Sequence, residues 1–179
     1  MYPKVKLVIK NLSKEQSLML LEKREIDFMI NLSPIENFGE KLTISDLKNL
    51  PHVFFASKKF VKTNLQSNKI TKADLEKLPT ITHLNNSSTM KMLRKALDKT
   101  KLNNNKEVAS SELVLGFVLK NKGIGYAIEQ LVNNNTDIIK LDCDFELPKA
   151  KLCVAINNDE TSKPVLAFID GLKEFCKKC

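Results

Sequence analysis

The sequence has no tryptophan, only five glycines and two histidines, and no apolar run of the roughly 20 residues that a membrane-spanning helix needs. Its first residues, MYPKVKLVIKNLSKEQ, lack the long apolar segment and the small-residue cleavage site of a secretory signal, so we expect a cytoplasmic protein without membrane contact. The histidines, His52 and His83, offer little for catalysis, and no group of histidine, cysteine and acidic residues has a metal-binding spacing. We therefore expect no enzymatic activity, no cofactor and no metal.

Arginine is scarce as well. Arg24 and Arg94 are the only arginines among 29 basic residues, although the net charge is +8. Arginine forks are the preferred means of reading base edges. The lysines are scattered and often accompanied by acids, as in EKREID (22–27), which is typical of a solvated surface rather than of a phosphate-binding track. These residues therefore do not predict direct nucleic-acid binding.

The four cysteines include one pair, Cys176 and Cys179, with the spacing of a redox motif. A reactive pair of this kind normally lies at a helix N-terminus, where the dipole lowers the thiol pKa. This pair lies at the C-terminal end of a predicted helix, and Cys176 also fits the apolar stripe of that helix. Packing is the favoured interpretation, with redox chemistry as the alternative.

The sequence does contain a regular alternation of strand and helix patterns, and 42% of its 179 residues are hydrophobic, which is enough for a sizeable core. Ser13, followed by Gln16, predicts a capping box, Thr71 caps a short helix that Pro79 ends, and Pro164 lies in the first turn of the last helix. A short amphipathic turn is expected at 44–50. Strands are expected at 5–9, 28–32, 52–57, 80–84, 107–110, 124–128, 138–143 and 151–157, and helices at 13–26, 71–78, 90–99 and 111–122 and from Ser162 onward.

This alternation predicts an α/β fold with helices on both sheet faces, arranged as two Rossmann-like lobes joined by two crossover strands. We expect lobe I at 1–54 with 156–179 and lobe II at 55–155, with HVFFAS (52–57) and KLCVAIN (151–157) as the connecting strands. Ligands of such folds bind where strand C-termini meet helix N-termini, in the crevice between lobes.

The stretch ASSELVLGFVLKNKGIGYAI (109–128) combines a serine pair, an apolar helix and two glycines before a strand. Ser110 or Ser111 can cap the helix, Gly123 suits a left-handed residue after it, and Gly125 allows a close approach of the strand to its neighbour. These structural roles suffice, because Gly-x-Gly without a third glycine and a downstream acid is a weak dinucleotide signal.

Candidate ligand-binding residues lie at these strand ends and helix starts. The loop 85–89 offers hydroxyls and backbone N–H groups to an anionic or carboxylate ligand, although its serines could serve only as an N-cap. His83 ends a strand and could face the crevice. The full set of candidates is Asn85, Asn86, Ser87, Ser88, Thr89, His83, Asn31, Ser33, Ser110, Ser111 and Tyr126.

Four segments in the same order resemble the effector-binding domain of LysR-type transcriptional regulators: REIDFMINLSP (24–34), HVFFASKKF (52–60), ITKADLEKLPTITH (70–83) and the stretch 109–128. The resemblance implies a bacterial domain of periplasmic-binding-protein type II-like fold that senses a small, anionic molecule. It also implies a homo-oligomer, with DNA contacted only through a helix-turn-helix domain.

The sequence departs from the family pattern at its start. The family's winged helix-turn-helix and linker helix have no counterpart, and neither do the strand and helix that open family effector domains. We therefore expect an N-terminally truncated domain with an incomplete lobe I. A solute-binding protein is the alternative, with an enzyme on the same fold as a third class; the lack of a signal peptide argues against the former and the lack of a catalytic constellation against the latter.

Overall fold

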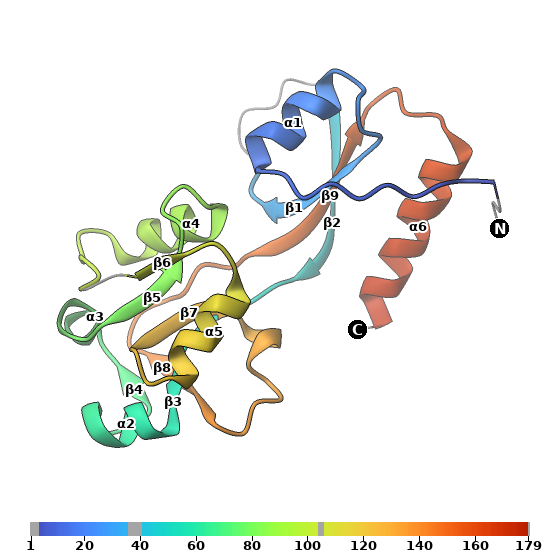
Figure 1. The fold of residues 1–179 in the computed structure, drawn as a ribbon. Coiled ribbons are helices and arrows are strands. Elements are labelled where there is room, and N and C mark those ends of the chain that lie inside the picture. Colours follow the sequence, from blue (N-terminus) through green and yellow to red (C-terminus); the bar gives the residue numbers. More distant parts are fainter. Residues whose placement is uncertain (1–3, 36–40, 104–105, 179) are drawn as a thin grey trace. The chain divides into compact units, whose positions relative to one another are not determined.

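The computed structural model describes residues 4–35, 41–103 and 106–178, and it shows the expected mixed α/β fold (Figure 1). The chain divides into two compact units. Unit 1 comprises Met1–Asn49 and Ala150–Cys179, and unit 2 comprises Leu50–Lys149. Among the helices of these described residues, none is long and apolar enough to cross a membrane.

Unit 1 is built on a three-stranded sheet in the order β1-β9-β2, with β1 (Met29–Ser33) and β2 (Leu42–Asn49) both antiparallel to β9 (Lys151–Asn157). Helix α1 (Lys14–Glu22) begins with the predicted capping box, and its buried leucines pack with Met29 and Ala155. Helix α6 (Lys163–Lys178) packs Ile169 with Leu47 and Val154. Because neighbouring residues of a strand point to opposite faces, the two helices cover the two faces of this sheet.

Three predictions for unit 1 are wrong. Residues 5–9 alternate like a strand but form none, because no neighbouring strand pairs with them. Residues 44–50 were expected to form a turn, yet most of them belong to β2, where a bulge between Asp46 and Lys48 interrupts the two-residue period. The first helix ends at Glu22 rather than near residue 26, since Arg24 adopts a left-handed backbone with φ 59°.

Unit 2 contains a six-stranded sheet in the order β4-β8-β3-β7-β5-β6. Strand β5 is parallel to both β6 and β7, whereas β3 is antiparallel to β7 and β8. Strands β3 and β9, which were expected to connect the lobes, lie within the sheets of unit 2 and unit 1. The elements of unit 2 are β3 (His52–Ser57), α2 (Lys58–Asn64), β4 (Lys69–Ile70), α3 (Lys72–Lys77), β5 (Thr80–His83), α4 (Ser88–Leu97), β6 (Lys106–Val108), α5 (Ser111–Leu119), β7 (Ile124–Ile128), the 3-10 helix η1 (Glu129–Leu131) and β8 (Ile138–Cys143).

The sheet of unit 2 is covered on both faces. Phe54 packs in a cluster with Leu75 of α3 and Leu93 of α4, while the adjacent Phe55 packs with Val114 and Val118 of α5. Figure 1 shows the corresponding arrangement, with α4 and α5 on opposite sides of β5. Coverage of both faces explains why the central strands β3 and β7 are largely buried and mostly apolar.

The glycines after α5 serve close packing. A Cβ on Gly125 would lie 2.7 Å from both Phe55 Cζ and Val118 Cγ2, which confirms that this strand needs a glycine for close approach. A Cβ on Gly123 would lie 2.3 Å from the Pro79 carbonyl oxygen. Gly123 does have a positive φ of 149°, but the left-handed residue directly after the helix cap is Asn121, with φ 58°, and not Gly123 as predicted. Asn121 is well suited to this conformation.

Candidate functional site

Two helices of unit 2 begin at the same edge of its sheet. Strands β5 and β6 are parallel, and their last residues, His83 and Val108, are register partners. Helix α4 follows β5 and helix α5 follows β6, so both helix N-termini lie beyond the carboxyl ends of these strands. This edge is the usual ligand-binding position in open α/β sheets.

The start of α4 carries hydroxyls and no acid. Ser87 is the N-cap, and its side chain accepts a hydrogen bond from the Met90 backbone N–H at 3.2 Å. Ser88 and Thr89 occupy the first turn, where Thr89 is buried and Ser88 half-buried. The positive end of the helix dipole at this position is not neutralised by a carboxylate of the first turn.

The start of α5 is different, since it holds a carboxylate of its own. Ser110 rather than Ser111 is the N-cap, and it accepts from the Leu113 N–H at 3.4 Å. The Glu112 carboxylate accepts hydrogen bonds from its own backbone N–H and from the Ser110 hydroxyl, and these lower the pKa of Glu112 below its usual value. An external anion would have to compete with Glu112 for the N-terminus of α5.

His83 and Ser111, both predicted from the sequence, are brought together in the structure. The His83 Nε2 atom lies 2.9 Å from the Ser111 Oγ atom, and this pair joins the end of β5 to the first residue of α5. Burial lowers the pKa of His83, with nearby Glu112 opposing the shift. The imidazole is therefore neutral at neutral pH and can exchange a hydrogen bond with the hydroxyl without adding charge to the site.

The structure adds His52, which the sequence did not suggest as a site residue. Its Nδ1 atom lies 3.0 Å from the Leu50 carbonyl oxygen and must donate to it, which leaves Nε2 as an acceptor 3.5 Å from the Thr89 hydroxyl. Burial lowers the pKa of His52 to about 4, so the ring is neutral at neutral pH. The available signal was a polar residue opening an otherwise apolar strand, HVFFAS.

Tyr126 lies in the core of unit 2 with 1% of its surface exposed. Its ring stacks on that of His52 at a centroid distance of 5.5 Å and also packs against Phe54. Burial raises the pKa of Tyr126 well above its usual range. Tyr126 therefore supports the imidazole that faces Thr89, and direct ligand contact by Tyr126 stays a prediction.

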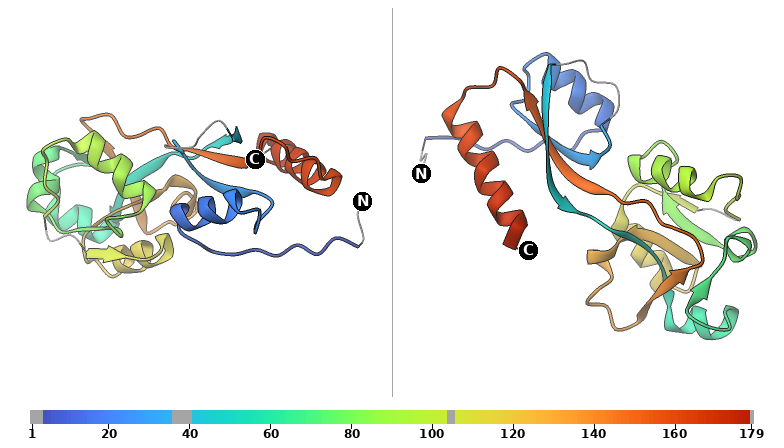
Figure 2. Two further views of the ribbon diagram at one scale, coloured as in Figure 1. Left: turned by 90° about the horizontal axis from the view of Figure 1, so that it is seen from above. Right: turned by 180° about the vertical axis from the view of Figure 1, so that it is seen from behind.

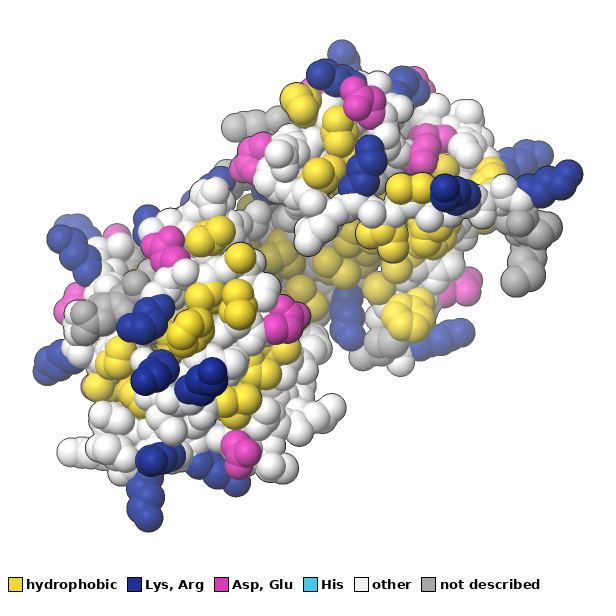
Figure 3. All heavy atoms as spheres, viewed as in Figure 1, with side chains coloured by type: hydrophobic (Ala, Val, Ile, Leu, Met, Phe, Trp, Pro, Cys, Tyr) yellow, Lys and Arg dark blue, Asp and Glu magenta, His cyan; other side chains and the backbone are white. Residues whose placement is uncertain are grey.

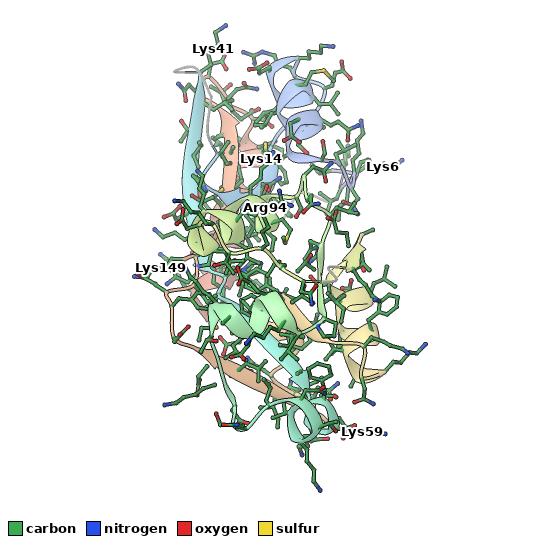
Figure 4. The ribbon with its side chains drawn as sticks, turned by 90° about the vertical axis from the view of Figure 1, so that its left-hand side faces the viewer. Lys6, Lys14, Lys41, Lys59, Arg94 and Lys149 are labelled. Carbon is green, nitrogen blue, oxygen red and sulfur yellow. The ribbon has the colours of Figure 1, made fainter. Side chains whose placement is uncertain are left out.

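Asn85 ties the loop after β5 to two other elements. Its backbone N–H donates to the Glu107 carboxylate at 3.0 Å, and its side-chain amide donates to the same group. Its amide oxygen accepts from Arg94, which Figure 4 labels on α4. Asn85 thus positions the loop through its own side chain, while the neighbouring Asn86 is exposed.

Asn31 and Ser33 belong to β1 of unit 1, apart in the chain from all other candidates. The Asn31 side-chain oxygen accepts from the Leu32 backbone N–H at 2.8 Å, and Ser33 is the register partner of Lys151. A role for these two residues in effector binding stays a prediction.

Of the cysteine pair, the structure describes only Cys176. Cys176 packs against the core of unit 1 around Ile169, as its place in the apolar stripe predicted, and Cys179 lies outside the described residues. Within ranges 4–35, 41–103 and 106–178, no group of three or more histidine, cysteine or acidic side chains could hold a metal ion.

This chain is similar to known proteins in both sequence and fold. The sequence matches the family model of the LysR substrate binding domain over residues 1–177, whereas no curated protein matches it. The regulatory domain of CcmR from Synechocystis PCC6803, solved in complex with 2-PG, has a TM-score of 0.81 at 20% identity, over 98% of this chain and 86% of that one.

Two further solved structures show the same fold. The apo regulatory domain of HypT from Salmonella typhimurium has a TM-score of 0.81 at 15% identity, over 100% of this chain and 86% of that one. The sulfate-bound regulatory domain of the OxyR2 E204G mutant from Vibrio vulnificus has a TM-score of 0.77 at 13% identity, over 98% of this chain and 84% of that one. At these identities the likeness indicates a shared fold.

Proposed function

Because the chain belongs to the LysR substrate-binding domain family, whose members are effector-binding regulatory domains, we propose that its unit 2 recognises a small anionic effector at the start of α4. The recognising groups are the hydroxyl of Ser88 and the backbone N–H groups of the first turn, whereas the Thr89 hydroxyl would have to release His52 before it could donate to the anion. The neutral His83–Ser111 pair forms the polar surroundings at the end of β5.

The observation that carries this proposal is the difference between the two helix starts. Helix α5 has Glu112 in its first turn, whereas helix α4 has no acid there. Backbone N–H groups at a helix N-terminus, together with the dipole, favour a bound anion. An anion at α4 therefore gains hydrogen bonds and dipole attraction without displacing a carboxylate of the protein.

Two structural relatives support the charge of the effector. The CcmR domain is described in complex with 2-PG, and the OxyR2 domain is described as sulfate-bound. Sulfate is a small oxyanion of the type that helix N-termini bind. We transfer to this chain the preference for an anion and leave the particular ligand to experiment.

The test compares ligand-induced thermal shifts of the wild-type chain and of the triple variant Ser87→Ala, Ser88→Ala, Thr89→Ala, using sulfate, phosphate and a panel of metabolic carboxylates. Loss of the hydroxyls should weaken the best anion at least tenfold, or about 1.4 kcal/mol, since each charge-assisted hydrogen bond contributes about that much or more. Loss of an N-cap alone costs about 1 kcal/mol of stability, so the shifts caused by ligand are compared and not the melting temperatures.

Ser110→Ala is the matched control, because it removes the N-cap of α5, the helix whose start already holds Glu112. The control should lose similar stability and keep the full ligand-induced shift. If the ligand-induced thermal shift is the same in the wild type and in the triple variant, the loop serves only as a helix cap. If Ser110→Ala reduces that shift as much as the triple variant does, the anion binds elsewhere.

We further infer a cytoplasmic regulatory role in which two or more copies associate and DNA is contacted through a helix-turn-helix domain. Family membership supports this interpretation, and it favours a regulator over a solute-binding protein or an enzyme. Effector binding would act by favouring one of two conformations of the assembly, as linkage requires.

A further inference from the structure

A group of lysines lies at the edge of the unit 2 sheet opposite the candidate effector site. Strands β5 and β7 are parallel and begin at this edge, whereas the candidate site lies beyond the carboxyl ends of β5 and β6. The lysines belong to α2 and to the turn between α5 and β7, and they are Lys58, Lys59, Lys62, Lys120 and Lys122. We propose that this lysine surface binds the phosphate backbone of double-stranded DNA without reading its sequence.

Hydrogen bonds hold the segments of the lysine surface together. The Ser57 hydroxyl, which caps α2, donates to the side-chain oxygen of Asn121, the residue between the two lysines of the turn. The Lys58 backbone N–H donates to the Asp137 carbonyl oxygen at 2.9 Å, which adds the loop before β8. Figures 1 and 2 show the same arrangement, with α2 beside the turn that leads from α5 into β7. Lysines that are scattered in the sequence are therefore gathered in the fold.

The net charge of unit 2 is concentrated on the lysine surface. Unit 2 contains 16 basic and 10 acidic residues, a net charge of +6, and the five lysines together with Asp137 of the adjoining loop carry +4 of it. All five lysines are exposed, and in the part of the chain that the structure describes none of them forms an ion pair. Dark blue side chains accordingly gather on the lower part of unit 2 in Figure 3.

The local structure accounts for only part of this grouping. A cation near the C-terminal end of α5 is favoured by the helix dipole, which explains a lysine in the turn. The three lysines of α2 add like charges beside it, and repulsion among like charges destabilises the folded chain. A polyanion bound at this surface would replace the repulsion by attraction, so an anionic partner explains why the lysines lie together.

The residues around the lysines select duplex DNA among the polyanions. Phe60 and Val61 of α2 are buried, so this helix offers no aromatic ring to stack on a single-stranded base and no apolar residue to enter a membrane. Protein interfaces are enriched in aromatic residues and arginine and depleted in lysine, which is the reverse of this surface. Duplex phosphates require neither stacking nor insertion, because lysine binds them as a point charge.

The neutral side chains of the surface also suit phosphate. Because the Asn121 oxygen accepts a hydrogen bond from Ser57, the amide NH₂ group of Asn121 remains as a further donor. Lys59, which Figure 4 labels on α2, points away from the sheet. The surface has no arginine, the residue that reads guanine edges in a bidentate manner, so its contacts fix no base sequence.

Binding at this edge is compatible with effector binding, since the two sites lie at opposite ends of the parallel strands. In the regulator proposed above, DNA held by another domain of the same chain would be present at a high effective concentration. The lysine surface would then add affinity without adding specificity. This setting rests on the proposed function, whereas the phosphate contact itself does not.

The test measures fluorescence anisotropy of a labelled 20-base-pair duplex on the full 179-residue chain between 25 and 100 mM NaCl. Five phosphate contacts give a slope of about −4.5 for the logarithm of the binding constant against the logarithm of salt concentration, so binding should weaken about 500-fold over this range. A second duplex of the same length and of scrambled sequence should bind with the same affinity, because no base is read.

Two triple variants with the same change in net charge, from +8 to +5, are compared. They are Lys59→Gln with Lys120→Gln and Lys122→Gln on the lysine surface, and Lys163→Gln with Lys177→Gln and Lys178→Gln on α6 of unit 1. All six side chains are exposed, so both variants should fold. The first should reduce the slope to about −1.8 and weaken binding at 25 mM NaCl at least tenfold, and the second should keep the slope and bind within twofold of wild type.

Two further probes distinguish other anionic partners: vesicles of phosphatidylserine and phosphatidylcholine, and a peptide of ten glutamates, both measured under the same conditions. We expect each to bind more weakly than the duplex. Absence of saturable duplex binding at 25 mM NaCl, or equal effects of the two triple variants, would overturn the proposal. Tighter binding of the vesicles or of the peptide than of the duplex would also overturn it, because a membrane or an acidic protein would then be the partner.

Discussion

Replacing Gly125 by alanine tests whether the close packing of α5 on β7 contributes to the stability of unit 2. The added methyl group would lie 2.7 Å from Phe55 Cζ and Val118 Cγ2 and 2.9 Å from Val114 Cγ1. These three neighbours are fully buried, so none can turn toward solvent to make room. Overpacking of a dense core by one methyl costs about 1–3 kcal/mol.

Gly116→Ala is the control, because Gly116 lies within α5 and an added Cβ there has no atom within 4 Å. Alanine in a helix interior is favoured over glycine by about 0.5–1 kcal/mol, so this variant should be more stable than the wild type. The two substitutions add the same methyl group at positions nine residues apart, 116 and 125, and are expected to change the free energy of unfolding in opposite directions.

Urea unfolding followed by far-ultraviolet circular dichroism gives the free energies, since the chain has no tryptophan to report fluorescence. With a urea slope of about 2 kcal/mol per molar, a loss of 2 kcal/mol lowers the midpoint of the transition by about 1 M. A Gly125→Ala chain as stable as the wild type would refute the reasoning, because it would mean that α5 can move away from β7 at no cost.

Two further outcomes are expected. Burial lowers the pKa of His52 from 6.5 to about 4, so the folded chain binds fewer protons than the unfolded chain between these pH values. The free energy of unfolding should therefore fall by up to about 3 kcal/mol as the pH drops from 6.5 to 4. His52→Gln should reduce that fall in urea titrations, and an unchanged fall would contradict the assignment to His52. The isolated chain should self-associate through the exposed Val5, Leu7 and Ile9. Light scattering across a concentration series should then show a mass above the monomer mass of 20.3 kDa, and a strictly monomeric, cooperatively melting chain would be the contrary result.

Local signals in the sequence predicted most helices and buried strands. The capping box at Ser13 and the helix cap at Thr71 lie where they were predicted, and the runs 124–128 and 138–143 match β7 and β8. These features depend on contacts within a few residues, or on burial at both faces of a sheet. Local contacts and burial on both faces each require particular residue types at particular spacings, so they can be recognised in the sequence.

The elements that were missed depend on partners distant in the chain. Residues 5–9 have the alternation of a strand, but a strand exists only where another strand pairs with it. Helix α2 was not predicted, because its lysine-rich sequence contains only two buried residues, Phe60 and Val61. The bulge in β2 is set by its pairing with β9, more than one hundred residues later, and no short window of sequence contains that information.

The candidate site was predictable to a similar extent. His83 and Ser111 were placed correctly at a strand end and a helix start, and they meet at 2.9 Å. His52 was missed because it faces Thr89 through a contact that spans 37 residues. The occupation of the α5 start by Glu112 was also missed, although an acid in a first turn was a readable signal.

The hydrogen bonds of Asn85 bear on the thermodynamics of effector binding. Asn85 fastens the loop after β5 to Glu107 and to Arg94 before any ligand arrives. Ordering a free loop on binding would cost about 1–2 kcal/mol for each residue that becomes fixed, and that cost would be subtracted from the affinity. Because the loop is already ordered in the folded protein, this entropy cost is not subtracted from the binding free energy, and a ligand with few contacts can bind with higher affinity. Releasing the loop by removing the side chains of both Arg94 and Glu107 would therefore weaken binding at the proposed site entropically, without the loss of a single contact to the effector.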